Sequence, residues 1–375
     1  MSCISYCSVI SVTQENVRKY QRINRKSRAV VLLYLVICIE YMQKVCRGYI
    51  TSQELWDRRC KGMIKTGVQT KGVISDSSPG QGFNLLKKNG FSCVDFSLNG
   101  YLTNIMLYQN DKNAFFDRTD GELESFFREH KRAAREEGIS IHQMHMPYPM
   151  YVPRGAQELN EYLWEVAAPK SMKLCAFFEC SYIVVHGFKL QYFLGSEELE
   201  WKETEKFLDS LAPLAKELGI TICIENLYTN IAGHIVEGPC CDARKAAERI
   251  DRFNEKYHAE VLGFCFDTGH ANLVGIDMEG FLKTLGSRLK VLHIHDNDGI
   301  ADLHQIPFTF TKTRENKVST DWEGFVRGLR AIHFDKVLSF ETAPVLTSFP
   351  EEMKEDVLEF IARIGRYFAG KVEAV

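Results

Sequence analysis

Six β-rich runs in the sequence each end on side chains that can bind a metal ion. The runs are ISIHQMHMP, YIVVHG, ITICIEN, LGFCFDTGH, VLHIHDND and KVLSFET, and the residues at or near their ends are His145, His186, Glu225, Asp267, His270, His295 and Glu341. Carboxylate oxygens together with imidazole nitrogens suit Mn²⁺, Mg²⁺, Co²⁺ or Zn²⁺, and the sequence does not choose among these ions. These residue types therefore predict metal-assisted chemistry.

The spacing of the runs indicates the fold that would bring their ends together. They alternate with charged stretches in which apolar residues recur at helical spacing. The expected strands are Ile64–Val68, Val94–Ser97, Ile139–Met146, Tyr182–Gly187, Ile220–Asn226, Leu262–Thr268, Val291–Asp296 and Lys336–Thr342. The clearest expected helices are 121–137, 203–218, 278–290, 322–332 and 351–368. Because parallel neighbours need crossover connections, this alternation predicts an α/β fold, a (β/α)₈ TIM barrel over residues 63–375.

The predicted barrel would gather these residues on one face, where the active sites of such barrels lie. A single buried His or Glu is usually a hydrogen-bonded structural residue. A desolvated group of carboxylates is different, because the charges repel one another unless a cation neutralises them. We therefore expect Glu225, Asp267, His295 and Glu341 to bind the metal. His293 shares the strand face of His295 but lies one step deeper, so we expect it to pack or hydrogen-bond instead.

Composition and charge narrow the class of protein. The 375 residues are 45% hydrophobic and 25% charged, which is ordinary for a globular protein. The twelve cysteines form no C-x-x-C pair, which favours free thiols and a cytoplasmic location. Residues 1–62 contain 11 Lys and Arg residues and four Asp and Glu residues. The remaining residues contain 35 Lys and Arg residues and 45 Asp and Glu residues, so this part of the chain is acidic. An acidic barrel repels a phosphate backbone, so nucleic acid is not the expected partner.

Residues 1–62 do not follow the barrel pattern and are expected to form a poorly defined N-terminal extension outside the fold. Their apolar stretch, Ala29–Ile39, is too short for a membrane span of about 20 residues and too far from the start for a signal peptide. Arg58 and Arg59 stand shortly before Met63. If AGG codons encode both arginines, they would form a ribosome-binding sequence, and Met63 would be the natural start. A native peptide from upstream of Met63 would exclude this hypothesis.

Eight motifs occur in order along the barrel: GFSCVDFSL, QMHMP, YIVVHG, IENL, CFDTGHANL, HIHDNDG, DLHQIP and SFET. In that order they resemble the xylose isomerase-like barrel superfamily, often called sugar phosphate isomerases and epimerases. In its ketose epimerases, one divalent metal is held at positions that match Glu225, Asp267, His295 and Glu341. The resemblance implies that the two glutamates also exchange protons with a sugar, sugar phosphate or polyol. It further implies that His270 contacts the substrate or the metal.

Three alternatives remain open. A polyol or inosose dehydratase would use the same metal and base. Endonuclease IV-like enzymes of the same superfamily cleave DNA with three zinc ions, and their additional ligands correspond to His145, His186, His270, Asp302 and His304. The expected number of ions is therefore one to three, although the acidic barrel disfavours a nuclease. A barrel that only binds a ligand is disfavoured because all four core ligands are present.

The segment after DLHQIP departs from the family pattern. The family usually has a short glycine-rich turn there, whereas this chain has the longer segment Phe308–Trp322, which contains no glycine. Lys312, Arg314 and Lys317 in this segment are expected either to bind an anionic substrate group or to face water, as charge runs usually do. A small carbohydrate is the expected partner. A homo-oligomer remains open, and no membrane association is expected.

Overall fold

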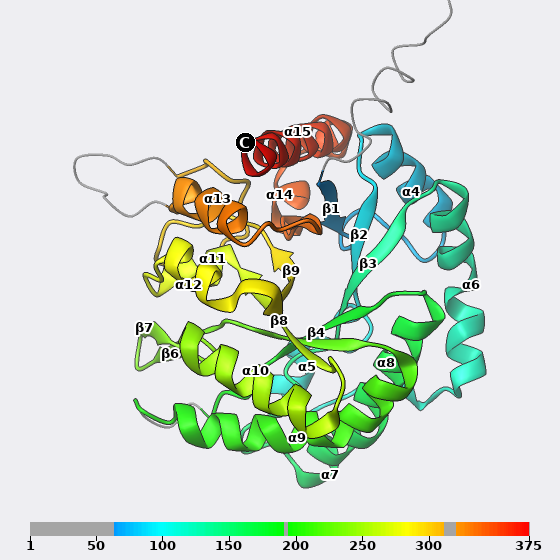
Figure 1. Cartoon of the computed structure of the whole chain (residues 1–375). Coiled ribbons are helices and arrows are strands. Elements are labelled where there is room, and N and C mark those ends of the chain that lie inside the picture. The colour runs from blue at the N-terminus through cyan, green and yellow to red at the C-terminus, as the bar shows by residue number, and fades with distance from the viewer. Residues whose placement is uncertain (1–63, 191–193, 311–319, 375) are drawn as a thin grey trace, which may run out of the picture. The chain divides into compact units, whose positions relative to one another are not determined.

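The computed structural model describes residues 64–190, 194–310 and 320–374. The N-terminal extension, the hypothesis about Met63, and the cations Lys312, Arg314 and Lys317 lie outside the described residues. Within the described residues, strands alternate with helices, and the strands of the main sheet are all parallel (Figure 1). No helix in these ranges is long and apolar enough to cross a membrane.

The main sheet has eight strands, as predicted. They are β1 (Lys65–Gln69), β2 (Cys93–Ser97), β3 (Ser140–His145), β4 (Tyr182–His186), β5 (Thr221–Glu225), β8 (Leu262–Asp267), β9 (Leu289–His293) and β10 (Val337–Phe340). Their order is β10-β1-β2-β3-β4-β5-β8-β9. The sheet closes because the Ile294 amide donates to the Ser339 carbonyl at 2.9 Å and the Glu341 amide donates to the Ile294 carbonyl at 3.1 Å. The predicted TIM barrel is therefore confirmed.

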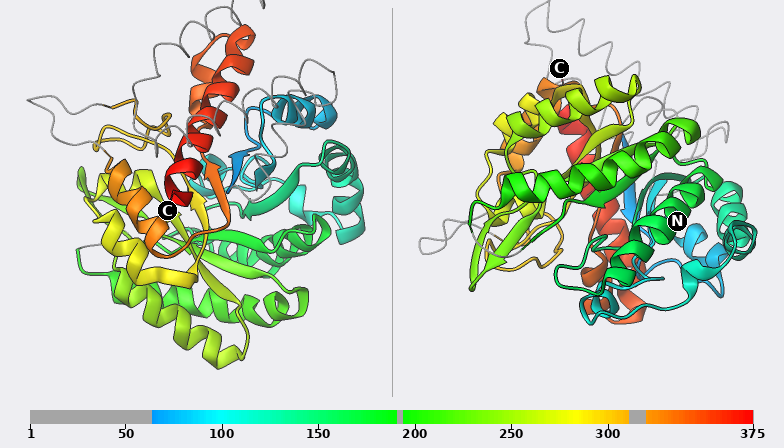
Figure 2. Two further views of the ribbon diagram at one scale, coloured as in Figure 1. Left: turned by 45° about the horizontal axis from the view of Figure 1, so that its top comes forward. Right: turned by 90° about the horizontal axis from the view of Figure 1, so that it is seen from below.

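The longer helices cover the outside of the barrel, whereas the short helix that carries His270 lies at the end of the barrel (Figure 2). The helices are α4 (Pro79–Lys88), α5 (Asn104–Tyr108), α6 (Asp120–Glu136), α7 (Gln157–Tyr162), α8 (Ala168–Phe177), α9 (Glu197–Leu218), α10 (Ala243–Tyr257), α11 (Thr268–Leu273), α12 (Met278–Leu285), α13 (Trp322–Ala331), α14 (Ala343–Ser348) and α15 (Lys354–Glu373). Outward-facing strand residues pack on them, as Phe96 of β2 does on Phe127 of α6, with ring centres 5.6 Å apart. The main apolar core therefore lies between the sheet and the helices.

Two features differ from the expected elements. The helix expected over residues 278–290 ends at Leu285, because Gly286 adopts a φ of 55° that ends the helix, and β9 begins earlier than expected. An unpredicted hairpin follows β5 and consists of β6 (Tyr228–Ile231) and β7 (His234–Glu237). Ala232 and Gly233 form its turn with φ values of 52° and 87°, the positive φ that two-residue hairpin turns require.

Candidate metal centre

An apolar layer inside the barrel lies directly beneath a polar cluster. The layer consists of Val184, Cys223, Cys265 and Val291, one residue from each of four adjacent strands. Side chains of a strand alternate between its two faces, so the next inward-facing residue lies two positions further on. Those next residues are His186, Glu225, Asp267 and His293. The strand pleat therefore places imidazoles and carboxylates in one layer above the apolar floor.

The four residues predicted to bind the metal lie in one cluster. The His295 Nε2 atom lies 3.0 Å from Asp267 Oδ2. His293 stands between the two glutamates, with Nδ1 at 3.2 Å from Glu225 Oε1 and 3.4 Å from Glu341 Oε2. Ligand atoms of Asp267, His293 and Glu341 all lie within 4.8 Å of one another. These separations are compatible with a shared ion.

Two further predicted residues approach Glu225 from neighbouring strands. His145 Nε2 and His186 Nε2 lie 3.6 Å and 3.2 Å from Glu225 Oε2. The Nδ1 atom of His145 donates to the Met146 carbonyl at 2.7 Å. Because a carbonyl can only accept, Nε2 of the neutral ring keeps its lone pair and faces the cluster. This arrangement fits a ligand group that shares Glu225.

Asp302 joins the other two predicted histidines. Its Oδ2 atom lies 3.4 Å from His270 Nε2 and 3.3 Å from His304 Nε2. The Nδ1 atoms of these rings donate to the carbonyls of Asn226 and Glu341, each at 3.0 Å. Backbone acceptors of this kind orient metal-binding imidazoles and leave the other ring nitrogen free for the ion. All nine predicted site residues in the described ranges are thus brought together.

His293 is buried and hydrogen-bonded, but its atoms also lie close enough to those of Asp267 and Glu341 to share an ion with them, a role that the sequence did not predict for it. Its Nε2 atom lies 3.0 Å from Asp95 Oδ2, which also accepts a hydrogen bond from Gln143 Nε2 at 3.1 Å. Asp95 and Gln143 come from β2 and β3, whereas His293 comes from β9. This contact therefore connects opposite parts of the barrel beneath the cluster and fixes the His293 ring between Glu225 and Glu341.

Burial and charge act in opposite directions on the pKa values of the cluster. Burial alone would raise the pKa of Glu225, but the imidazoles of His293 and His186 hold it well below its usual range. Burial would likewise raise the pKa of Asp302, and the adjacent imidazoles lower it. Burial also lowers the pKa of His186 to about 4, in spite of Glu225 beside it. For His270, His293 and His304, the nearby carboxylates outweigh burial and raise the pKa, so a cation that binds these imidazoles must displace their protons.

Several buried polar atoms of the cluster have no hydrogen-bond partner in the described part of the chain. They include Glu225 Oε2, His295 Nδ1 and Asp302 Oδ1. Nearly all buried polar atoms of folded proteins have a partner. A divalent ion would supply the missing partner, and the mixed oxygen and nitrogen donors suit such an ion. The residues present therefore fit a divalent-metal centre.

Gly269 approaches His295 so closely that no side chain fits between them. A Cβ atom at this position would lie 1.9 Å from His295 Cε1. We expect Gly269→Ala to displace this ring, weaken metal binding and lower the free energy of unfolding by about 1–3 kcal/mol, as overpacking does. Urea unfolding and metal titration measure the two effects. Gly121→Ala in α6 is the control, because its Cβ would meet open space. An equal loss in both variants would contradict the expectation.

Three residues beside the cluster were not predicted. The side chain of Lys189, which follows β4, lies with Nζ 4.8 Å from the centre of the Tyr228 ring, and burial lowers its pKa. Tyr228 belongs to the hairpin β6–β7, and its ring centre lies 5.3 Å from that of His270. The ring of Tyr148 lies 4.6 Å from that of His186. Single lysines and tyrosines in connecting segments have no distinguishing spacing, so the sequence carries no signal for them.

The chain belongs to the xylose isomerase-like TIM barrel family. The family description "Xylose isomerase-like TIM barrel" matches residues 83–364, a range that contains the whole polar cluster. An uncharacterized protein of Sinorhizobium fredii, y4fM, is 32% identical over 91 residues. That match spans 24% of this chain and 27% of the Sinorhizobium protein.

Several solved structures have a similar fold. D-psicose 3-epimerase from Clostridium cellulolyticum H10, solved with D-tagatose, has a TM-score of 0.57 and 14% identity over 82% of this chain and 99% of that one. The 3-keto-D-glucoside 4-epimerase YcjR from E. coli has a TM-score of 0.56 and 16% identity over 80% and 99% of the two chains. The IolI protein, solved with a bound zinc atom, has a TM-score of 0.53 and 16% identity over 83% and 100%. At such identities, the likeness shows the fold alone.

Proposed function

We propose that this protein is a divalent-metal-dependent isomerase or epimerase that acts on a sugar, sugar phosphate or polyol. The observation that carries this proposal is the placement of Glu225 and Glu341, which reach the same nitrogen of His293 from the ends of β5 and β10. Asp267 and His295 complete the proposed ligand set. The membership of the barrel family and the sugar epimerases among its structural neighbours support the same reaction class.

The two glutamates suit proton transfer at a carbon next to a carbonyl. One carboxylate would remove the proton and the other would return it to the opposite face, which inverts the configuration. The side chain of Glu225 is 1% exposed and that of Glu341 is 20% exposed, so Glu341 is the carboxylate that can exchange its proton with solvent. A bound divalent ion would stabilise the negative charge that develops on the substrate oxygens.

Deuterium exchange tests this proposal directly. Metal-loaded protein in D₂O should incorporate deuterium at the carbon next to the carbonyl of a ketose, and an isomeric sugar should form in parallel. D-fructose, D-tagatose, D-psicose and an inosose are suitable substrates, and mass spectrometry with NMR measures both products. Loss of water from the inosose without isomer formation would replace the proposal with a dehydratase. Absence of exchange in all four sugars and in D-fructose 6-phosphate, with metal bound, would contradict it.

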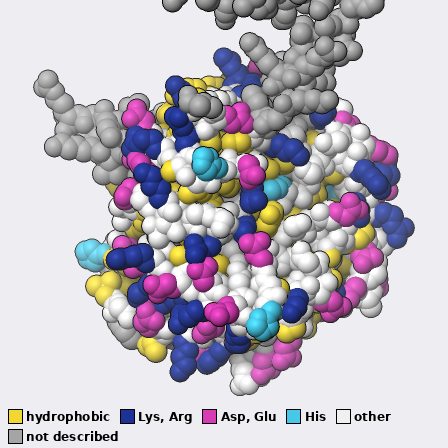
Figure 3. All heavy atoms as spheres, in the orientation of Figure 1, with side chains coloured by type: hydrophobic (Ala, Val, Ile, Leu, Met, Phe, Trp, Pro, Cys, Tyr) yellow, Lys and Arg dark blue, Asp and Glu magenta, His cyan; other side chains and the backbone are white. Residues whose placement is uncertain are grey.

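Hydrolysis of a phosphate ester is a second candidate function. Glu225 with His145 and His186 forms one potential ligand group, and Asp302 contacts His270 and His304 in another. Adjacent ions can stabilise both the attacking and the leaving oxygen of a phosphate ester. On the face in Figure 3, basic and acidic side chains of the described residues are intermingled, which does not favour a DNA backbone. Three bound zinc ions together with cleavage of abasic-site DNA would establish this alternative.

A further inference from the structure

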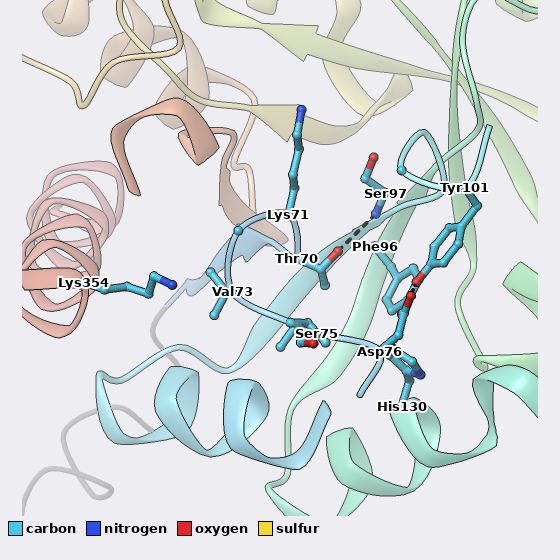
Figure 4. Close-up of a pocket in the computed structure, with 13 residues that line it drawn as sticks. Thr70, Lys71, Val73, Ser75, Asp76, Phe96, Ser97, Tyr101, His130 and Lys354 are labelled. Atoms are coloured by element: carbon cyan, nitrogen blue, oxygen red, sulfur yellow. Dashed lines mark hydrogen bonds and ion pairs between the residues drawn. The ribbon is translucent and has the colours of Figure 1, made fainter. Parts of the chain in front are cut away.

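A cavity of about 510 Å³ lies beside the two barrel strands that supply none of the nine predicted site residues. These strands are β1 and β2. The cavity is lined by residues 70–76 after β1, by Ser97 and Tyr101 at and after the end of β2, and by Lys354 of α15 (Figure 4). The other six strands end in the polar cluster, so the space over β1 and β2 is free of proposed ligands. None of the nine cluster residues lines this cavity, which is therefore a separate space beside the cluster.

Strand pairing places this cavity next to the cluster. Ser97 is aligned with His145 in the β2–β3 pair, and its amide donates to Thr70 Oγ1 at 3.3 Å. On the other side, Val68 of β1 is aligned with Phe340, the residue before Glu341. Neighbouring strands lie about 4.8 Å apart. Ser97, a lining residue, is therefore one strand spacing from His145.

The charges of the cavity are divided between its two sides. Lys71 stands at the rim and Lys354 reaches in from α15, whereas Asp76 lies on the opposite wall (Figure 4). Lys71 has no hydrogen-bond or ion-pair partner among the described residues. Lys354 contacts Glu351 at 2.6 Å, with its own side chain 19% exposed and that of Glu351 78% exposed, so an anionic ligand here would compete with Glu351 for the lysine. The lysine side is therefore suited to an anion.

The wall that carries Asp76 is held in place without a ligand. Asp76 Oδ1 accepts a hydrogen bond from the Tyr101 hydroxyl at 2.6 Å and lies 3.0 Å from His130 Nε2. Burial lowers the pKa of His130, so its ring is neutral at pH 7. Glu351 pairs with Lys354, so among the described residues Lys71 is the lysine of the lining that has no ion-pair partner and is available to an anion. The cavity is thus preformed, as ligand sites usually are.

We propose that this cavity is a subsite for the non-reacting end of the substrate, and that it binds a phosphate or carboxylate group between Lys71 and Lys354. The inference rests on the proposed function, because the reacting end is placed in the metal cluster. The substrate would then be an anionic sugar or polyol. Its hydroxyl groups would face Asp76 and Ser75 on the far wall, so the cavity would select both the charge and the orientation of the substrate.

Calorimetric titration of the metal-loaded protein tests the subsite with D-glucose, D-glucose 6-phosphate and D-glucuronate. These probes share one ring and differ at the terminal carbon. We expect at least one anionic probe to bind about tenfold more tightly than glucose, because charge-assisted hydrogen bonds are the strong ones. Lys71→Ala and Lys354→Ala should each reduce this preference about fivefold and leave the affinity for glucose unchanged. The stronger of the two anionic probes identifies the anion.

Lys87→Ala is the matched control, because this exposed lysine of α4 lies outside the cavity. It should keep the full preference for the anionic probe. Equal affinities for all three probes would overturn the subsite, as would a preference that survives both cavity substitutions. If the preference is found but deuterium exchange is absent, the subsite stands and the isomerase proposal fails. If exchange is found without the preference, only the subsite fails.

Discussion

Glu341→Gln should reduce turnover by about 10²–10⁴-fold, the contribution usually made by a general acid or base. The substitution keeps the size of the side chain but removes the group that accepts the proton, and it also weakens a proposed metal ligand. The fold should be preserved, because the hydrogen bond that closes the barrel uses the Glu341 amide and not its carboxylate. The rate of deuterium exchange in D₂O and the melting temperature measure the two effects.

Glu352→Gln is the control for this experiment. Glu352 is exposed in the short helix before α15 and lies outside the cluster. The same chemical change should therefore leave both the exchange rate and the melting temperature unaltered. Full exchange activity in Glu341→Gln would refute the proposed acid–base role. An equal loss of activity in both variants would show that the effect does not come from the cluster.

Glu225→Ala should abolish metal binding. Its two carboxylate oxygens face His145, His186 and His293, so one substitution removes a proposed ligand from two of the candidate ion groups. Plasma mass spectrometry should find one to three ions per chain in protein purified without chelators and close to none in the variant. An ion present at 100 to 1,000 times its dissociation constant stabilises the fold by about 3–4 kcal/mol. Chelator treatment should therefore lower the melting temperature of the unsubstituted protein and not that of the variant.

Glu248→Ala in α10 is the matched control for the metal measurement, because Glu248 is exposed and lies outside the cluster. It should retain the same number of ions as the unsubstituted protein. One ion per chain would agree with the isomerase or epimerase, and close to three zinc ions would favour phosphate-ester hydrolysis. A metal-free protein after careful purification would contradict both reactions.

Much of the barrel could be predicted because two features of the sequence indicate its strands. One is the run of apolar residues, and the other is the polar residue at the end of each run. The two-residue alternation that places Glu225 above Cys223 and Asp267 above Cys265 is visible in the sequence. A parallel barrel then brings such strand ends to one face whatever their separation along the chain. For this reason the positions of all nine cluster residues could be predicted, while their roles stay predictions that the experiments above test.

The features that could not be predicted depend on backbone geometry and on contacts between connecting segments. The early end of α12 depends on the positive φ of Gly286, and glycine occurs too widely to mark one such position. The hairpin after β5 has strands of only four residues, too short for a clear alternation. Lys189 and the lining of the cavity belong to loops, whose neighbours are set by the packing of the whole barrel.

The spread of the cluster along the chain has a consequence for how the protein is made. A growing polypeptide leaves the ribosome from its N-terminus at about 5–20 residues per second, so His145 emerges long before Glu341. Glu341 reaches the cluster only after β10 has paired with β1 and made its bridge to Ile294. The newly made chain therefore carries Glu225 and Asp267 without Glu341 until β10 has been made and has docked. Binding of the proposed ion would then wait until the final strand of the barrel docks.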